Sequence, residues 1–457
     1  MTTAIRSGSV PAHDPTTADL ERLAGYPHVV ISWIDESGYP TSVATTFETD
    51  LDAGTVTLAA PTGMPIPTDR EINVTGSHIR PQPGIGYDER RYLQLWGRTP
   101  DGRTFTPTRA WGWDETETPF FEYSERSVPQ SRRYLAALSL EKGHTIRPRL
   151  GLFWLALRTT RLPFLSATAV PVLLGIAVAA SHDAFTWWTA LLTLIGGSFA
   201  HLAINVTNDI FDTLSGADDA NTTPTQFSGG SRVAVYDLVS IRGLSWLALG
   251  LFAIAGSVGL LLVAITGSLT LLWIGLAGIL VGVAYTAPPL KLVYRGLGEI
   301  AVAIGFGPIM LLGAYVVQTG RLAWEPLVLS LVPGALIALI LFVNEIPDRR
   351  SDAEAGKRTL PTRFSPDIIR TGYLVVALAA FAVIAGGVAG GLLPWPTLIA
   401  LAAVPLALRV HAGLKVHYDS PYTLMAVMGT NVNLNLAVGG LLLIGYVVAI
   451  LVMRLAG

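Results

Sequence analysis

From about residue 160 onward, the sequence is a succession of apolar runs that are each long enough to cross a bilayer. A transmembrane helix needs about 20 mostly apolar residues. Because lipid cannot hydrogen-bond an exposed backbone, such runs must be helical. The sequence therefore predicts an all-α, multi-span membrane bundle over residues 150–457. We expect about nine spans, near 163–181, 186–207, 243–265, 268–286, 297–318, 325–345, 368–388, 392–410 and 434–454.

Residues 1–145 have a different composition, in which charged, aromatic and turn-forming residues are mixed. Short strands are expected within 28–50, 55–61, 70–79 and 91–100, with helices near 16–25 and 130–140. Strands at this spacing predict a small, soluble, mainly-β barrel domain. The N-terminus lacks the apolar core of a secretory signal, so we expect this domain to stay in the cytoplasm.

The loop charges predict how the bundle is oriented. Loops after even-numbered spans carry Arg232, Arg242, Lys291, Arg295, Arg349, Arg350, Lys357, Arg358, Arg363, Arg409 and Lys415, whereas the opposite loops carry only Arg321. Cytoplasmic loops of membrane proteins are enriched in Lys and Arg. We therefore expect a multi-pass protein of the cytoplasmic membrane, with its N-terminal domain and the even-numbered loops in the cytoplasm.

Overall composition excludes several kinds of chemistry. The chain has no cysteine, so it can form neither a disulfide nor a thiolate metal site, and any metal must be held by oxygen or nitrogen ligands. The formal net charge is only -2, which gives no reason to expect a nucleic-acid partner.

A polar motif, NDIFDTLSGADD, ends the second predicted span at residues 208–219. Residues three and four apart share one face of a helix. One polar stripe on this otherwise apolar span is therefore formed by His201, Asn205, Asn208, Asp209 and Asp212. Because lipid cannot solvate such groups, the stripe must face the protein interior.

A second motif, NEIPDRRSDAEAGKRTL, ends the sixth predicted span at residues 344–360. Asn344, Asp348 and Asp352 recur there at every fourth position, again on one helix face. Both motifs end spans on the same side of the membrane. We therefore expect the two carboxylate stripes to converge on one cavity.

The chemistry of the two motifs indicates a diphosphate ligand. Carboxylates and amides suit hard cations such as Mg²⁺, which also keeps phosphate oxygens in its shell. Nearby cations can bind the remaining diphosphate charge. The candidates are Arg161, Lys291, Arg295, Arg349, Lys357 and Arg358. The expected ligand is an amphiphile with a diphosphate head and an apolar tail.

The two motifs resemble the two Asp-rich motifs of the UbiA superfamily of intramembrane prenyltransferases. RLPFLSATAVPVLLG (161–175) and YTAPPLKLVYRGLGE (285–299) resemble two further segments of that family, and the resemblance covers about residues 150–457. Within the superfamily, SGAD, SGGSR (228–232) and GKRTL are most similar to the menaquinone branch. That branch implies a polyprenyl diphosphate donor and 1,4-dihydroxy-2-naphthoate as the aromatic acceptor.

The resemblance and the electrostatics together assign roles. Mg²⁺ would be held by Asp209, Asp212, Asp218, Asp348 and Asp352. The diphosphate would be bound by Arg161, Asn208, Lys291, Lys357 and Arg358. The residues expected to act directly on the reacting groups are Tyr285, Lys291 and Asp348, with the Tyr285 ring facing the allylic cation.

Other interpretations stay open at this point. Asp218 and Asp219 would be solvated loop residues in most proteins, and loop cations often serve only to set topology. Intramembrane acids also mark ion pathways, so an ion transporter is the alternative from a different functional class. Within the superfamily, another quinone precursor, a tetrapyrrole or a glycerol-phosphate lipid is an alternative acceptor.

The N-terminal domain resembles the split-barrel family of flavin- and deazaflavin-binding proteins. The resemblance is carried by GYPHVVISWIDESGYPTSVAT (25–45) and SHIRPQPGIGYDERRYLQLWGR (77–98). It implies that FMN or a deazaflavin binds through Ser77, His78, Arg80 and Arg98. The alternative is a barrel that has lost its cofactor and serves as a docking module.

Overall fold

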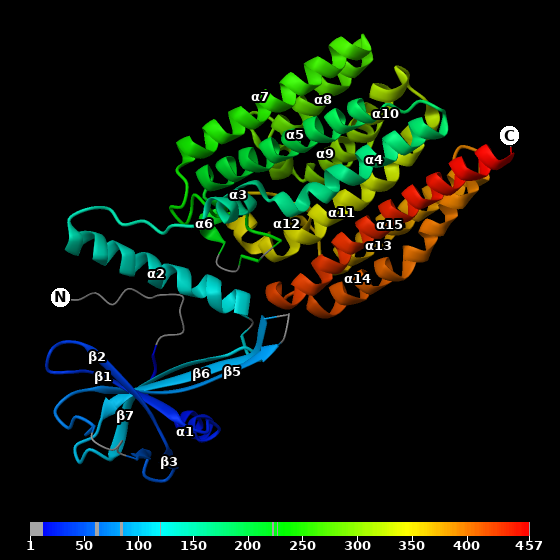
Figure 1. Ribbon diagram of the computed structural model, residues 1–457. Coiled ribbons are helices and arrows are strands. Elements are labelled where there is room, and N and C mark those ends of the chain that lie inside the picture. Colours follow the sequence, from blue (N-terminus) through cyan, green and yellow to red (C-terminus); the bar gives the residue numbers. More distant parts are fainter. Residues whose placement is uncertain are drawn as a thin grey trace. The chain divides into compact units, whose positions relative to one another are not determined.

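The computed structural model describes residues 12–59, 64–82, 86–118, 120–221, 224–225 and 227–456. The chain divides into two compact units, Met1–Thr145 and Ile146–Gly457 (Figure 1). Each unit has a hydrophobic core of its own.

The N-terminal unit is a half-barrel. In the described part of the chain it contains a seven-stranded antiparallel sheet with the order β2-β1-β5-β6-β7-β4-β3. The strands are β1 (Val29–Ile34), β2 (Pro40–Thr45), β3 (Phe47–Asp50), β4 (Thr55–Leu58), β5 (Ile72–Gln82), β6 (Gly86–Arg98) and β7 (Thr104–Asp114). Helix α1 (Thr17–Ala24) packs its apolar side against the sheet core, and α2 (Phe120–Lys142) ends the unit. The predicted mainly-β N-terminal domain is therefore confirmed.

Strand β7 was not among the expected strands. It contains Pro107, and proline is normally confined to edge strands and bulges because it cannot donate to the ladder. In the structure Pro107 lies opposite Gly97, where the register of β6 and β7 shifts. A Cβ on Gly97 would lie 2.1 Å from the Thr106 carbonyl oxygen, so the close approach of the two strands requires glycine there.

The C-terminal unit is a helical bundle. In the part of the chain that the structure describes, eight helices are long and apolar enough to cross a membrane. They are α5 (Trp187–Leu214), α7 (Ile241–Thr266), α8 (Leu269–Thr286), the α9–α10 segment (Gly298–Thr319), α11 (Trp324–Glu354), α13 (Pro366–Ala389), the η4–α14 segment (Trp395–His417) and α15 (Pro421–Ala456). The first predicted span is a shorter apolar helix, α4 (Ser166–Ser181), which follows α3 (Leu152–Thr160) and the 3₁₀ turn η1 (Leu162–Leu165). The chain is thus a multi-pass membrane protein, as predicted.

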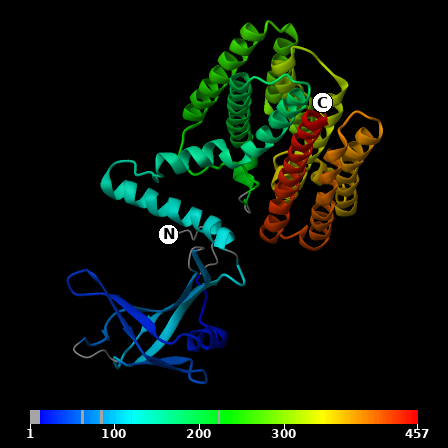
Figure 2. The same cartoon turned by 45° about the vertical axis from the view of Figure 1, so that its right-hand side comes forward.

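Small residues bring the central helices close together. A Cβ on Gly175 of α4 would lie 2.3 Å from the Leu311 carbonyl oxygen of α10, and a Cβ on Gly334 of α11 would lie 2.6 Å from the Ala303 carbonyl oxygen of α9. Such contacts let helix backbones pack without a hydrophobic driving force between them. Helix α7 lies on one side of the bundle, and α13, α14 and α15 lie on the opposite side (Figures 1 and 2).

Candidate active site

The first motif ends α5 with two buried carboxylates that already have partners. Asp209 accepts a hydrogen bond from Arg161 Nη2 at 2.6 Å and from the Ser231 backbone N–H at 3.2 Å. Asp212 accepts from the Tyr294 hydroxyl at 2.8 Å and from Asn208 Nδ2 at 2.9 Å. The stripe that was predicted on this helix therefore faces the protein interior.

The second motif ends α11 and meets the first. Asp348 accepts from Asn221 Nδ2 at 2.8 Å and from the Gly229 N–H at 2.9 Å, and both donors follow the first motif in the chain. Lys357 Nζ lies 3.4 Å from Asp212 Oδ2 and 3.7 Å from Asp352 Oδ1, so one ammonium joins the two motifs. The expected convergence is present in the structure.

The glycine-rich segment 228–232 supplies donors that the sequence interpretation missed. Gly229 and Gly230 have φ values of +76° and +72°, in the region that favours glycine. A Cβ on Gly230 would lie 2.9 Å from Asp218 Oδ1 and 3.2 Å from Arg161 Nη2. Because of this turn, backbone N–H groups reach Asp209 and Asp348. In the sequence, the two adjacent glycines are the local signal that could have indicated this turn.

Two of the predicted cations lie over one aromatic ring, whereas Arg295 donates to the Pro289 carbonyl oxygen and Arg349 pairs with Asp419, so these two do not join the cluster. Lys291 Nζ lies 5.0 Å and Lys357 Nζ 5.5 Å from the centroid of the Tyr294 ring. The Arg358 side chain is exposed, and its backbone N–H donates to the Tyr294 carbonyl oxygen at 3.0 Å. Tyr294, which had not been singled out from the sequence, therefore links the expected Lys291 to Asp212, whereas the Arg358 guanidinium is not part of this contact.

Charge at the site is only partly compensated. Burial raises the pKa of Asp218 to about 8, and the nearby Asp212 and Asp209 carboxylates add to this effect. Burial would lower the pKa of Lys357, but attraction from Asp212 and Asp352 outweighs it, so the pKa lies well above its usual value. Asp218 is only 4% exposed, whereas the neighbouring Asp219 is exposed, so Asp218 is a buried member of the cluster.

The donor set fits a hard cation that shares its shell with other ligands. Asn208 Oδ1 and Asp352 Oδ2 are buried oxygens without a hydrogen-bond partner in the described chain. No three acidic or histidine side chains of the described residues converge closely enough to hold an ion by themselves. Mg²⁺ usually takes only one or two carboxylates and completes its shell with waters and substrate phosphate oxygens. The residues present therefore fit Mg²⁺ together with a phosphorylated ligand.

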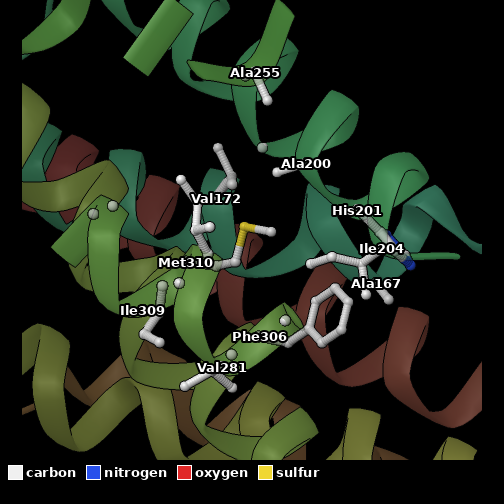
Figure 3. A pocket seen from close by; sticks show the side chains of 18 of the residues that line it. Ala167, Val172, Ala200, His201, Ile204, Ala255, Val281, Phe306, Ile309 and Met310 are labelled. Carbon is white, nitrogen blue, oxygen red and sulfur yellow. The ribbon is translucent and has the colours of Figure 1, made fainter. Parts of the chain in front are cut away.

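An apolar cavity of about 560 Å³ extends from the motifs into the bundle (Figure 3). Its polar lining near the motifs includes Arg161, Asn208, Tyr285 and Asn344. The far end of the cavity lies at Leu271 of α8. Leu271 is fourteen residues before Tyr285 on the same helix, so the two residues are about 20 Å apart along the helix axis. The shape of the cavity matches an amphiphile with a polar head and an apolar tail.

His201 has a structural partner in the wall of this cavity. Its Nδ1 lies 2.9 Å from the Thr168 hydroxyl of α4, and its ring packs edge-on against Phe306 with centroids 4.8 Å apart. Figure 3 shows His201 and Phe306 on the same side of the cavity. This histidine therefore joins two helices as a satisfied interior residue.

The model of the UbiA prenyltransferase family matches residues 168–435. This chain belongs to the UbiA prenyltransferase family. It is therefore a UbiA-type prenyltransferase, which decides between the enzyme and the transporter interpretations. Both Asp-rich motifs lie inside the matched region of this UbiA chain.

Named relatives of this UbiA chain come from several bacteria. The chain is 29% identical to a 2-carboxy-1,4-naphthoquinone phytyltransferase of Synechocystis sp., over 64% of this chain and 92% of the relative. It is 35% identical to a 1,4-dihydroxy-2-naphthoate octaprenyltransferase of Mycobacterium tuberculosis, over 52% and 78%. It is also similar to the solved structure of a UbiA homolog from Archaeoglobus fulgidus bound to GPP and Mg²⁺, with 14% identity, 63% and 99% coverage and a TM-score of 0.45.

The candidate cofactor residues of the N-terminal domain lie on β5 and β6. Arg80 pairs with Asp88 at 2.8 Å and with Glu89 at 2.8 Å, and His78 Nε2 lies 3.3 Å from Glu89. The Ser77 and Arg98 side chains are exposed. A cofactor phosphate that used Arg80 or His78 would have to displace these carboxylates.

Proposed function

We propose that this chain transfers a polyprenyl group from polyprenyl diphosphate to 1,4-dihydroxy-2-naphthoate, a step of menaquinone biosynthesis, and releases diphosphate. The observation that carries the proposal is the position of the two aspartate motifs, which meet Arg161 and Lys357 at the polar end of a deep apolar cavity. That combination suits a donor with a charged head and a long apolar tail.

The proposed donor head lies between the motifs. Mg²⁺ would be held by Asp209, Asp212, Asp218, Asp348 and Asp352. When bound, it would stabilise the negative charge that develops as the allylic C–O bond breaks.

Fixed cations of the protein would meet the diphosphate oxygens. Arg161 and Lys357 are already in place beside the aspartates, and Lys291 lies over the ring of Tyr294, which bonds to Asp212. Arg358 is exposed beside the second motif and would have to turn its side chain toward the ligand. Preorganised charges in a low-dielectric site stabilise developing charge without reorganisation at the moment of reaction. Asn208 would contribute its Nδ2 group to the same ligand.

The chain's own residues would also protect the allylic cation. Tyr285 lies in the cavity wall near the motifs, and its ring can face a cation. Beyond it the wall is made of apolar side chains, which exclude water until the acceptor ring attacks. In the proposed reaction the ring carbon that gains the prenyl group loses its carboxylate as carbon dioxide.

The relatives support the choice of acceptor and the location of the site. Both are named for naphthoate or naphthoquinone acceptors that carry a carboxyl group. We infer that the motif end of the bundle faces the cytoplasm and that the protein resides in the cytoplasmic membrane, because the loops at that end carry most of the loop Lys and Arg residues.

A screen of donors and acceptors tests the proposal. Membranes containing the protein are incubated with Mg²⁺, a polyprenyl diphosphate and one acceptor at a time: 1,4-dihydroxy-2-naphthoate, another quinone precursor, a tetrapyrrole or a glycerol-phosphate lipid. Product mass, carbon dioxide and released diphosphate are measured. We expect prenylated product with the naphthoate. Product with a different acceptor and none with the naphthoate would show that the acceptor assignment is wrong.

We further propose FMN or a deazaflavin as a ligand of the N-terminal half-barrel, bound near Ser77, His78, Arg80 and Arg98. The resemblance of residues 25–45 and 77–98 supports the proposal, and the carboxylate partners of Arg80 weigh against a phosphate at that residue. Flavin absorbance of the purified full-length protein, or binding of added FMN or deazaflavin, would support it. A colourless protein that binds neither would indicate a docking module.

A further inference from the structure

Helix α3 presents an apolar face to the exterior of the C-terminal unit. Its exposed residues are Leu152, Phe153, Trp154 and Ala156, of which the first three are 85%, 67% and 65% exposed. The one charged side chain of the helix, Arg158, is only partly exposed. A helix whose outer side faces water normally carries polar residues there. The four exposed residues form the outer face of α3, which therefore suits an apolar neighbour.

The inner side of α3 is held by the candidate active site. Arg158 Nε donates to the Ser231 carbonyl oxygen at 2.8 Å. Leu155 packs against the apolar cluster that α5 and α7 form. Arg161, the residue that caps α3, pairs with Asp209 at 2.6 Å. These contacts fix the orientation of α3, so its outer face cannot turn into the bundle.

Helix α3 is too short to cross a bilayer. Its nine residues are about 14 Å long at the helical rise, whereas a hydrocarbon core is about 30 Å thick. It does not extend the next span either, because Arg161 has a φ of +53°, in the left-handed region, and ends the helix. Since Arg158 and Arg161 contact the motif site, α3 lies at the end of the bundle where the two motifs meet.

Exposed tryptophans mark the two ends of the bundle. At the end away from the motifs, α5, α8, α11 and η4 each carry one at or near the first residue: Trp187, Trp273, Trp324 and Trp395. At the motif end, Trp246 is exposed near the start of α7, and Trp154 is exposed on α3. Tryptophan is enriched at both membrane–water interfaces, where its ring lies at the level of the headgroups. Trp154 therefore has the position of an interfacial residue.

The chain around α3 is positively charged. From residue 142 to residue 161 it contains no Asp or Glu, and its Lys and Arg residues are Lys142, Arg147, Arg149, Arg158 and Arg161. Arg147 and Arg149, which precede the helix, are exposed. Anionic headgroups attract Lys and Arg residues that lie near a membrane surface. An apolar face beside two exposed arginines is therefore complementary to a bilayer surface that contains anionic lipid.

We propose that α3 lies in the bilayer interface at the motif end, with its outer face among the acyl chains and with Arg147 and Arg149 on anionic phospholipid headgroups. Short helices with one apolar face and nearby cations bind membrane surfaces in this way. The inner side of the same helix holds the Ser231 segment and Asp209, so the lipid contact sets the level at which the site lies in the membrane. The inference goes beyond the proposed reaction and does not depend on it.

The test uses one fluorescent label on the full-length protein, which has no cysteine of its own. A nitrobenzoxadiazole fluorophore is attached at Phe153→Cys, in nanodiscs of phosphatidylcholine and phosphatidylglycerol. Quenching is measured with each lipid in turn carrying a doxyl spin label near the headgroup end of its acyl chain. Ile254→Cys, 43% exposed in the middle of α7, is the lipid-facing control. Asp367→Cys, at a side chain that is 91% exposed, is the water-facing control.

We expect strong quenching of the label at position 153 and much weaker quenching at position 367. The phosphatidylglycerol should associate with position 153 at least about fivefold more tightly than the phosphatidylcholine, which is the effect of one arginine near an anionic surface. At position 254 the two lipids should quench equally. The same label in a protein that also carries Arg147→Gln and Arg149→Gln should lose the preference for the anionic lipid.

Two results would overturn the proposal. Quenching at position 153 no stronger than at position 367 would show that lipid does not reach the outer face and that another part of the protein covers it. Equal association of the two lipids at position 153 would show that Arg147 and Arg149 do not bind anionic headgroups. If Phe153→Cys lowers the unfolding temperature, Leu152→Cys reports on the same face, because Leu152 is the more exposed of the two.

Discussion

Replacing Asp348 by asparagine would separate the charge of the second motif from its structural role. Asp348 accepts hydrogen bonds from Asn221 Nδ2 at 2.8 Å, from the Gly229 N–H at 2.9 Å and from the Ser228 side chain. None of these donors carries a charge. An asparagine can offer its Oδ1 to the Gly229 N–H, and the amide of Asn221 can turn so that its own oxygen accepts from the new Nδ2.

The structural cost of Asp348→Asn should therefore be small. A hydrogen bond to a charged group contributes about 1.5–3 kcal/mol and one between neutral groups about 0.5–1.5 kcal/mol. Replacing a hydrogen bond to a charged group by a neutral one at the Asn221 and Gly229 donors lowers the free energy of unfolding by about 2 kcal/mol. The charge that no longer has to be buried offsets part of this loss. We expect the unfolding temperature to change by roughly 5 °C or less.

The effect on turnover should be much larger. Groups that only orient a metal ligand typically contribute 10–100-fold to activity. If Asp348 is itself a Mg²⁺ ligand, Asp348→Asn should lower kcat at least about 100-fold. The assay is diphosphate release by the full-length protein in nanodiscs over a range of Mg²⁺ concentrations, together with thermal unfolding of the same samples.

Asp367→Asn is the matched control for this experiment. Asp367 lies in the first turn of α13, pairs with Arg370 at 3.0 Å and has a side chain that is 91% exposed, so the same chemical change is made at an ion pair outside the two motifs. Exposed ion pairs contribute little to stability, and we expect the control to keep its activity. Turnover of Asp348→Asn above a tenth of the control, with the same Mg²⁺ dependence, would refute a metal-binding role for Asp348.

Two further predictions concern stability. Burial raises the pKa of Asp19, but hydrogen bonds from Thr16 outweigh it and hold the pKa below the usual 3.8. The resulting stabilisation of α1 is present above the unfolded pKa and is lost as pH falls through the folded pKa. We expect the hydrogen-exchange protection of α1 in the full chain to be constant near neutral pH and to decrease below about pH 4, and unchanged protection at pH 3 would contradict this. In α15, Gly445→Ala should lower the free energy of unfolding by about 1–3 kcal/mol, because the new Cβ would lie 2.7 Å from Thr397 Cα. Gly440→Ala on the same helix meets no atom within 4 Å and should be neutral or slightly stabilising, and equal unfolding temperatures for both variants would disprove the packing argument.

The sequence was sufficient to predict the bundle and the meeting of the two motifs. Apolar runs of membrane length allow few structures other than helices, and carboxylates at helical spacing cannot face lipid. Asp212 and Asp352 could therefore be placed at one site from their spacing and from the side of the membrane on which both spans end, and Lys357 joins them in the structure. Their roles as metal ligands stay predictions.

The partners of these carboxylates could not be predicted, because they come from loops. Tyr294 reaches Asp212 from the 3₁₀ turn after α8, and Asn221 reaches Asp348 from the segment after α6 (Ala217–Ala220). The path of such loops is fixed by tertiary contacts and by single left-handed positions such as Gly229 and Lys291, which have no periodicity to detect. Strand β7 was missed for a related reason. The bulge beside Pro107 lies at Thr108, where β7 has one residue more than β6, and it is defined only by the pairing of the two strands.

The balance of charge at the motifs bears on how a donor would bind. In the described part of the chain, only Arg161 and Lys357 form ion pairs with the five aspartates proposed as metal ligands. Asp348 accepts hydrogen bonds only from neutral donors, although the charge of Lys357 also acts on it. Burial raises the pKa of Asp218 to about 8, and the Asp212 and Asp209 carboxylates add to this effect. A bare diphosphate would therefore be repelled by the excess of carboxylates, whereas divalent cations would be attracted to them. We expect a nonhydrolysable donor analogue to bind the full-length protein weakly in EDTA and at least about tenfold more tightly with Mg²⁺, because one additional unit charge pair at about 4 Å contributes more than 1.4 kcal/mol at an effective dielectric constant of 20. Equal affinity in both conditions, measured by isothermal titration calorimetry, would show that the protein's own cations suffice for the diphosphate.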